Sequence, residues 1–219
     1  MNYVQLYQSI QDYAETTEQL FVANIPRFVQ EAEDRIYNSV QIPALRRNVT
    51  GNLTSGNKYL SLPNDWLANY SLAVIDANGN YEYLLNKDVN YIRQAFPNPS
   101  DTGQPTHYAL FGPQYSNPNE LSILVGPTPD ASYGAELHYF YYPESIVDAG
   151  TSWLGDNYSP VLLYGSLVEA YTYMKGEPDL LQAYNAKYNE ALQQLNRLGT
   201  GLERGDAYRD GQAKIRVNP

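Results

Sequence analysis

The spacing of apolar residues changes twice along this chain of 219 residues, and this change limits the folds that the chain can adopt. Near both ends, apolar side chains recur every three or four residues, which is the repeat of one face of an α-helix. Between them, short apolar runs are separated by Pro, Gly and Asn, as in a β-sheet. We therefore predict helices at about residues 3–15, 25–41, 159–175 and 180–198, and a β-rich insertion at about 45–147.

Turn and cap residues support these helix boundaries. Pro26 suits the first turn of the second helix, because proline lacks an N–H that this turn would leave unpaired. Ser159 and Pro160 are typical of the cap and the first position of the third helix. Gly199 and Gly201 are predicted to end the fourth helix, since glycine commonly occupies the position after a helix.

Asn78 and Gly79 separate two short apolar runs and predict a β-hairpin, because both residues tolerate a positive φ. The neighbouring Asp and Asn residues also resemble the start of a calcium loop. That interpretation is disfavoured, because Tyr81 stands where the loop needs glycine and Lys87 where it needs glutamate. The hairpin strands are predicted at 72–75 and 81–85, and further strands at 58–63, 108–111, 121–125 and 135–142.

The helices from both ends of the sequence are expected to pack together, with the β-rich region inserted between them. This arrangement is an α+β fold, predicted as a single domain over residues 1–199. Residues 200–219 have no sustained period, few apolar groups and mixed charges. They are predicted to form an extended C-terminal arm that does not fold on its own.

The charge and the lack of cysteine exclude several classes of protein. The chain has 24 Asp and Glu against 14 Lys and Arg, a net charge of −10. This disfavours tight binding to DNA, because affinity for phosphate comes mainly from Lys and Arg. Disulfides and thiolate metal sites are excluded because there is no cysteine. No apolar run approaches the ~20 residues of a membrane span, and the first residues lack the pattern of a signal peptide.

No catalytic or metal-binding constellation stands out in the sequence. His107 and His138 are the two histidines, and neither has a second histidine at ligand spacing. The glycines do not match a phosphate-binding loop. Carboxylates are plentiful, but nothing singles out a pair for acid–base chemistry. We therefore predict no enzymatic activity, no cofactor and no metal, and we expect a structural subunit that works in an assembly.

Tyrosine is unusually frequent, with 22 residues, or about a tenth of the chain. A tyrosine ring is apolar with a polar tip, which suits surfaces that are buried on association. Tyrosine also packs well in β-sheets. Both interpretations fit the sequence, and they are compatible with each other.

Several motifs occur in a characteristic order. They are a second-helix stretch, a strand that ends in Leu-Pro-Asn-Asp-Trp, a short segment that precedes a strand, a strand that runs into a Pro-x-Pro turn, the strand after that turn, and the start of a closing helix pair. They lie at Ile25–Ile36, Tyr59–Trp66, Pro105–Ala109, Leu121–Pro129, Leu137–Pro143 and Tyr158–Gly165. This order resembles the head-to-tail adaptor (connector) proteins of tailed bacteriophages, in particular the portal-adaptor family of short-tailed phages. The resemblance covers about residues 20–197.

The resemblance implies a ring, usually of twelve copies, that docks under the portal protein, continues the DNA channel and receives the tail, nozzle or fibre proteins. It implies a place in the virion neck, after assembly in the host cytoplasm. The resemblance also implies that the arm extends onto the portal protein and binds it. Its expected contact residues are Arg204, Tyr208, Arg209, Lys214, Ile215 and Arg216.

The genomic DNA is expected to pass through the ring without tight binding, because the chain is acidic. The contrary case is a basic channel inside an acidic ring, which Arg46, Arg47, Lys58 and Lys87 could line. Two other functions remain open from the sequence. One is a β-rich module that binds carbohydrate or a receptor on a virion or cell surface. The other is an enzyme with a carboxylate pair.

Overall fold

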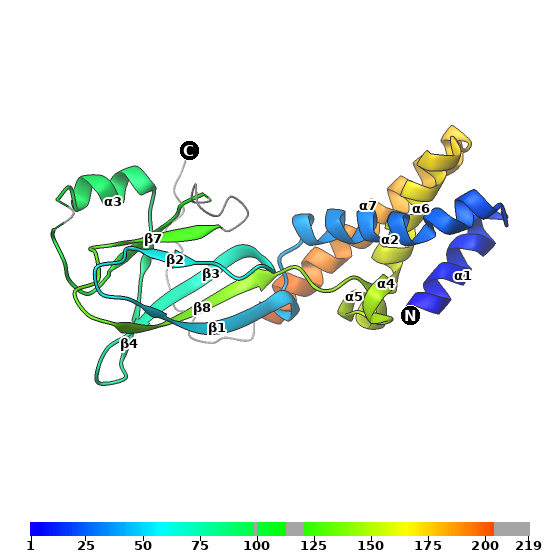
Figure 1. The fold of residues 1–219 in the computed structure, drawn as a ribbon. Helices are drawn as coiled ribbons and strands as arrows, with labels where there is room; N and C mark the ends of the chain where they lie inside the picture. Colours follow the sequence, from blue (N-terminus) through cyan, green and yellow to red (C-terminus); the bar gives the residue numbers. More distant parts are fainter. Residues whose placement is uncertain (99, 113–120, 204–219) are drawn as a thin grey trace. The chain divides into compact units, whose positions relative to one another are not determined.

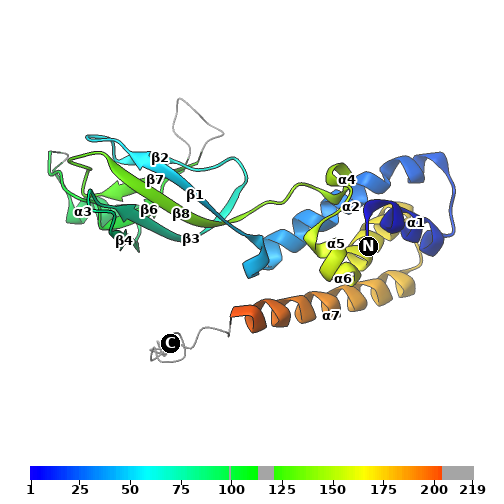
Figure 2. The same cartoon turned by 90° about the horizontal axis from the view of Figure 1, so that it is seen from below.

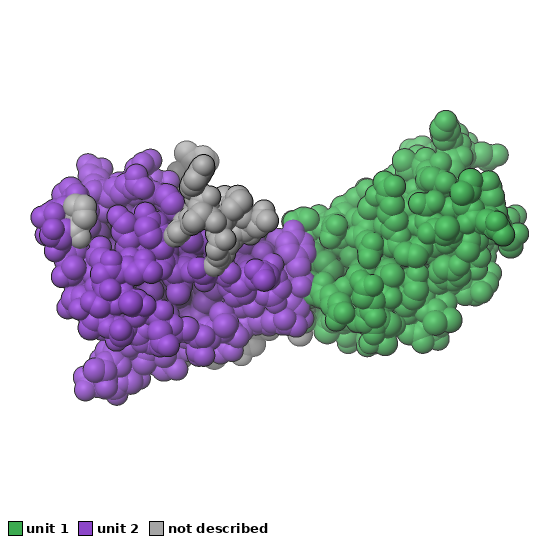
Figure 3. All heavy atoms as spheres, viewed as in Figure 1, with its two compact units in different colours: residues 1–45, 143–219 green, residues 46–142 purple. Residues whose placement is uncertain are grey.

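The chain folds into helices and two β-sheets, which confirms the predicted α+β class (Figure 1). The structure is a computed structural model that describes residues 1–98, 100–112 and 121–203. It divides into two compact units. Unit 1 combines Met1–Leu45 with the residues from Pro143 onward, and unit 2 is Arg46–Tyr142 (Figure 3). The β-rich region is thus inserted between helices from both ends of the sequence, as the periodicity predicted.

Unit 1 is a helical bundle built around α6. This helix is apolar on most of its circumference, as expected for a helix that other helices surround. It contacts α1, α2, α5 and α7, and both ribbon views show α7 running beside it (Figures 1 and 2). The helices of the unit are α1 (Tyr3–Ala14), α2 (Gln19–Ser39), α4 (Ile146–Ala149), α5 (Trp153–Asn157), α6 (Ser159–Met174) and α7 (Pro178–Glu203), with a 3-10 turn η1 (Pro43–Leu45). No described helix is both long and apolar enough to cross a membrane.

The second helix starts six residues before its predicted position, at Gln19 instead of residue 25. Pro26 therefore lies inside α2 and not at its first turn. An interior proline removes one backbone hydrogen bond and costs about 3 kcal/mol. Phe21 and Ile25 are almost fully buried just before it, and burying such side chains contributes about 1.5–3 kcal/mol each. The packing of this first part of α2 offsets the local cost of the proline.

The last helix continues past its predicted end. Gly199 lies within α7, which runs to Glu203, so the first four residues of the predicted arm are helical. A Cβ atom on Gly199 would collide with the side chain of Ile42. The glycine therefore allows α7 to pass close to the segment after α2, and does not adopt the left-handed conformation that would end the helix.

Unit 2 consists of two four-stranded sheets that share a core. One sheet has the order β1 (Arg46–Leu53), β8 (Tyr133–Tyr141), β3 (Trp66–Ile75) and β4 (Tyr81–Tyr83). The other has the order β2 (Tyr59–Ser61), β7 (Ser122–Gly126), β6 (His107–Leu110) and β5 (Leu85–Asn86). Every pairing is antiparallel except that between β5 and β6. A single cluster of buried side chains from both sheets forms the core, among them Leu53, Leu72, Val74, Ile123, Val125 and Leu137.

A short helix, α3 (Val89–Ala95), covers the second face of the β2-β7-β6-β5 sheet. Ile92 packs on Leu124 of β7, and a Cβ atom on Gly126 would lie 2.6 Å from Cγ2 of Ile92. The end of β7 must therefore be glycine for α3 to approach. Helix α3 was not predicted from the periodicity, because its seven residues lie between segments with a strand pattern.

The predicted hairpin is confirmed as the connection between β3 and β4. Asp76 accepts hydrogen bonds from the backbone N–H groups of Asn78 and Asn80 and from the Asn80 side chain. These donors lower the pKa of the Asp76 carboxyl group. Gly79 has a φ of +83°, which glycine adopts without strain.

Candidate subunit interfaces

The arm residues that the resemblance assigned to the portal lie outside the described part of the chain. They are Arg204, Tyr208, Arg209, Lys214, Ile215 and Arg216. Their contacts with a partner stay a prediction. Other contacts that a subunit of an assembly could make lie on the surfaces of the described residues.

The two arginines at the start of β1 are held against aromatic rings. Successive strand residues point to opposite faces of a sheet, so the two guanidinium groups separate. Arg46 lies 3.9 Å from the ring centroid of Tyr70, and Arg47 lies 3.8 Å from that of Tyr141. Arg47 also forms an ion pair with Asp65, with an N–O distance of 2.8 Å.

Asp65 connects Arg47 to a further strand of the sheet. It accepts a hydrogen bond of 2.9 Å from the hydroxyl group of Tyr139, in the neighbouring strand β8. Burial raises the pKa of Tyr139, and the hydrogen bond to Asp65 adds to the increase. Arg47, Asp65 and Tyr139 therefore tie β1, the start of β3 and β8 together.

The other basic residues of unit 2 also lie beside aromatic rings. Lys58 is 5.7 Å from the ring centroid of Tyr59, Lys87 is 5.2 Å from that of Tyr91, and Arg93 is 5.7 Å from that of Phe111. Together with Arg46 and Arg47, these are all the Lys and Arg residues of the unit. Each of these cations thus has an internal aromatic contact.

The outer face of the β1-β8-β3-β4 sheet carries exposed tyrosines. Tyr81 is 52% exposed and Tyr83 is 65% exposed, and Tyr70 is exposed as well. We call these three residues the tyrosine face. Glu136 lies on the same side of the sheet and accepts a hydrogen bond of 2.5 Å from the Asn48 amide. Exposed rings with polar tips are well suited to a protein interface.

Glu136 also lies close to Tyr81 and His138 on this face. Its negative charge raises the pKa of the Tyr81 hydroxyl group. The Nε2 atom of His138 lies 3.4 Å from a carboxylate oxygen of Glu136. The second histidine, His107, is in the other sheet, where its ring contacts Tyr91 and its Nδ1 atom lies 2.8 Å from the Thr106 hydroxyl group. The two histidines therefore do not share a site.

A second group of tyrosines packs between the helices of unit 1. Tyr184 of α7 contacts the rings of Tyr13, Tyr164 and Tyr171, with centroid distances of 6.2, 6.5 and 4.8 Å. Burial raises the pKa of Tyr184 to about 12, with a smaller contribution from Tyr171. The hydroxyl group of Tyr171 donates a hydrogen bond to the carbonyl oxygen of Tyr13. Packing between helices is a use of tyrosine that neither interpretation of the sequence named.

Apolar side chains are exposed near the ends of four helices of unit 1. They are Tyr13 of α1, Leu20 of α2, Tyr173 of α6 and Leu180 of α7, and we call them the bundle end. Each is between 42% and 66% exposed. Apolar groups gathered at exposed positions are a candidate for contact with another subunit.

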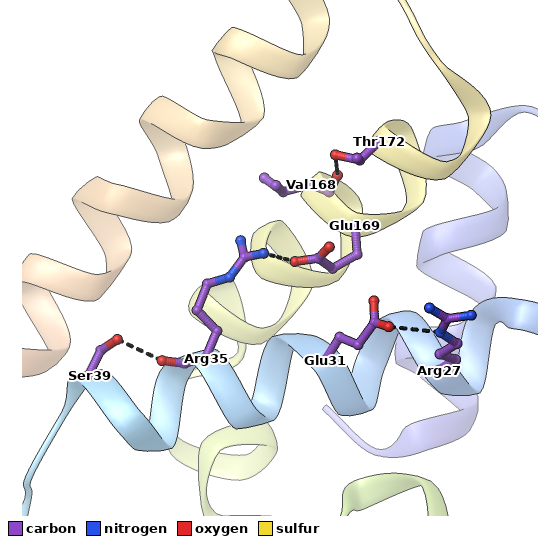
Figure 4. A network of polar contacts seen from close by, with 7 residues as sticks. All are labelled: Arg27, Glu31, Arg35, Ser39, Val168, Glu169 and Thr172. Carbon is purple, nitrogen blue, oxygen red and sulfur yellow. Dashed lines mark hydrogen bonds and ion pairs between the residues drawn. The ribbon is translucent and has the colours of Figure 1, made fainter.

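Two of the helices that carry the bundle end, α2 and α6, are joined by an ion pair. Arg35 of α2 forms an ion pair with Glu169 of α6, and Arg27 pairs with Glu31 four residues along α2 (Figure 4). The second pair is exposed, so it contributes a few tenths of a kcal/mol. The pair between α2 and α6 is more buried on the side of Glu169. Polar contacts therefore reinforce the packing between these two helices.

No group of three or more His, Asp or Glu side chains that could hold a metal ion occurs within the described ranges. The geometry that is present consists of ring stacking, ion pairs and exposed apolar positions. These features support binding between proteins.

Comparison with known proteins gives one family. The family model described as SU10 adaptor protein matches residues 1–216, which includes both compact units. None of the curated proteins compared with the chain matches it.

Proposed function

Because this chain belongs to the SU10 adaptor protein family, we propose that its copies form a ring that joins the phage head to the tail. Membership of this family identifies the chain as a structural bacteriophage adaptor, a component of the head-tail connector. The family match over nearly the entire chain is the observation that carries the proposal. In the proposed assembly, about twelve copies dock under the portal protein, continue the DNA channel and receive the tail proteins.

The exposed features of both units support contact with other subunits. The tyrosine face offers Tyr70, Tyr81 and Tyr83, and the bundle end offers apolar side chains from four helices. Closed rings need two different patches on each subunit, one for the neighbour on each side. A subunit with separate candidate patches on two units is suited to this geometry.

The charge distribution supports passage of DNA without tight binding. The net charge of the chain is −10, so a ring of about twelve copies would carry about −120 in total. The basic residues of unit 2 contact aromatic rings, and Arg47 is also paired with Asp65. The unit has only five Lys and Arg residues, and affinity for DNA grows with the number of Lys and Arg engaged.

The arm beyond α7 is proposed to bind the portal. Arg204, Arg209 and Arg216 would donate paired hydrogen bonds to carboxylates or backbone carbonyls there, because a guanidinium group has several donors in a fixed plane. In this proposal, subunits assemble in the host cytoplasm and end in the virion neck.

Replacement of these three arginines by alanine tests the portal contact. We expect the variant to lose binding to portal in a co-sedimentation assay. A control variant exchanges Arg27, Lys175 and Arg197, which are exposed residues of unit 1 with the same total charge. Equal binding by the two variants would contradict the portal contact of the arm.

A further inference from the structure

A groove runs along one side of the unit 2 sandwich, where both sheets end. It has a volume of about 310 Å³. Among the described residues, β1 is the last strand of one sheet and β2 the last strand of the other, so no described strand pairs with the outer edge of either. The groove is lined by Val49, Thr50 and Gly51 of β1, Leu60 and Ser61 of β2, the following Leu62 and Pro63, and Ala135 and Leu137 of β8.

The β1 wall of this groove is a part of the core face that the described residues leave uncovered. Val49 pairs directly with Leu137, and directly paired residues lie on the same face of a sheet. Leu137 is buried in the core, whereas Val49 is 39% exposed. Gly51 pairs with the buried Ala135, and a Cβ atom on Gly51 would meet no atom within 4 Å. The core face therefore has space beside β1 for apolar side chains from outside.

The backbone of β1 is also open to a further strand. β1 has eight residues and pairs along its whole length with β8. In an antiparallel strand, every second residue directs its N–H and C=O groups away from the partner. An extended segment can add to such an edge through backbone hydrogen bonds, while alternate side chains enter a pocket.

One segment of the chain outside the described residues has the sequence pattern for this position. From Ala213 to Val217 apolar and basic residues alternate strictly, as Ala213, Lys214, Ile215, Arg216 and Val217. Alternation with a period of two is the pattern of a strand with one buried face. Ile and Val are also among the residues that strands favour most.

We propose that Ala213–Val217 of a neighbouring copy adds as a fifth strand to the free edge of β1. Ile215 and Val217 enter the groove and complete the core between β1 and β2. Lys214 and Arg216 then point to the opposite face, because side chains alternate along a strand. They remain available for the portal contact proposed above.

This inference rests on the proposed ring, since the strand comes from a second copy. The ring brings each groove next to the arm of a neighbour, and repeated exchange of arms links the copies into one closed assembly. Each strand contact is small by itself. Many such contacts in one ring strengthen each other, because each one holds the partners of the next close together.

The absence of cysteine allows a direct test with the full-length protein. One preparation carries Val49→Cys and an affinity tag, and another carries Ile215→Cys without the tag. The two are mixed, assembled with portal and treated with a short bismaleimide. Because each chain has a single cysteine, a cross-linked pair must join two copies. We expect a band of two chains that contains one tagged and one untagged copy.

A matched control places the first cysteine at Asn48, on the outer face of the same strand. We expect several-fold less cross-linking for Asn48→Cys with Ile215→Cys than for Val49→Cys with Ile215→Cys. Equal yields, or no cross-link in assembled rings, would overturn the strand addition while leaving the ring intact. A further preparation carries Val49→Cys and Ile215→Cys in the same chain. If it cross-links only within single chains, and the mixed single-cysteine preparations do not cross-link, the exchange between copies is overturned. Absence of rings, measured by light scattering, would contradict both this inference and the proposed function.

Discussion

A carboxylate oxygen of Glu33 accepts a hydrogen bond of 3.0 Å from the backbone N–H group of Ile146, 113 residues further along the chain. The other oxygen accepts a hydrogen bond of 2.6 Å from the hydroxyl group of Ser145. Glu33 is only 2% exposed. This contact therefore ties the middle of α2 to the start of α4, at the point where the chain re-enters the helical unit after the β-rich insertion.

Glu33→Ala is expected to destabilise unit 1 by about 1–3 kcal/mol, because it leaves a buried N–H group without an acceptor. Glu33→Gln keeps an acceptor for Ile146 and removes the buried charge, so it is expected to cost less. Urea unfolding at pH 7 measures both changes. Equal losses for the two variants would show that the hydrogen bond to Ile146 does not determine the stability here.

The same residue predicts a pH dependence. Burial raises the pKa of Glu33 in the folded state, and the hydrogen bonds from Ser145 and Ile146 reduce this shift. A raised folded pKa means that the folded state binds the proton more tightly than the unfolded state. Its contribution to stability is complete below the unfolded pKa and is lost as the pH rises through the folded pKa. Between pH 4 and 7, the wild-type protein should therefore lose stability relative to Glu33→Gln. A difference in stability between the wild type and Glu33→Gln that stays constant over this pH range would contradict the raised pKa of Glu33.

Gly126→Ala is expected to destabilise unit 2 by roughly 1–3 kcal/mol, the usual cost of overpacking. The added Cβ atom would lie 2.6 Å from Ile92 and 2.9 Å from Phe96. Gly51→Ala is the matched control, since a Cβ atom there meets nothing within 4 Å. The fluorescence of Trp66, in a Trp153→Phe background, reports on the unfolding of unit 2. Similar unfolding midpoints for both variants would contradict the tight packing of α3.

Arg47→Ala is expected to cost about 1 kcal/mol, from the partly exposed ion pair with Asp65 and the contact with Tyr141. Arg47 is itself 54% exposed, which limits the electrostatic part. Arg27→Ala removes an exposed pair within one helix and should cost only ~0.3–0.5 kcal/mol. Denaturation curves at low and high salt measure the loss of stability in each of the two variants. A larger loss for Arg27→Ala would contradict the proposed role of Arg47 in joining β1 to β3.

Local signals explain which parts of the fold could be predicted. The hairpin could be predicted because its turn is formed by Asn78 and Gly79, which are adjacent in the sequence. Pro26 and Gly199 led to wrong helix boundaries, because proline usually marks a helix start and glycine a helix end, and tertiary packing overrides both preferences here. The burial of Phe21 and Ile25 extends α2 in front of the proline, and the close approach to Ile42 explains the glycine.

Strand β1 could not be predicted, because Arg46–Leu53 contains only two large apolar residues, Val49 and Leu53, with a glycine midway between them. It is an edge strand whose position depends on pairing with β8. The internal use of Arg46 and Arg47 was likewise not visible, since their ring partners lie 24 and 94 residues away in the sequence. The arm residues Arg204 to Arg216 came from the family resemblance and lie outside the described residues.

The isolated protein is expected not to bind duplex DNA tightly. The net charge is −10, and the cations of unit 2 are engaged with aromatic rings. A filter-binding titration at low salt checks this. Micromolar or tighter binding that weakens steeply with salt would show many phosphate contacts, and would favour a basic channel over a passive one.

Electron microscopy of the purified protein mixed with its portal tests the central claim most directly. We expect closed rings of this protein, about twelve copies each, stacked coaxially on portal with one continuous channel. The mixture must contain these particles without any tail protein, since the adaptor is proposed to dock on the portal first. Monomers that stay separate from portal rings, at concentrations where both proteins are folded, would contradict the account.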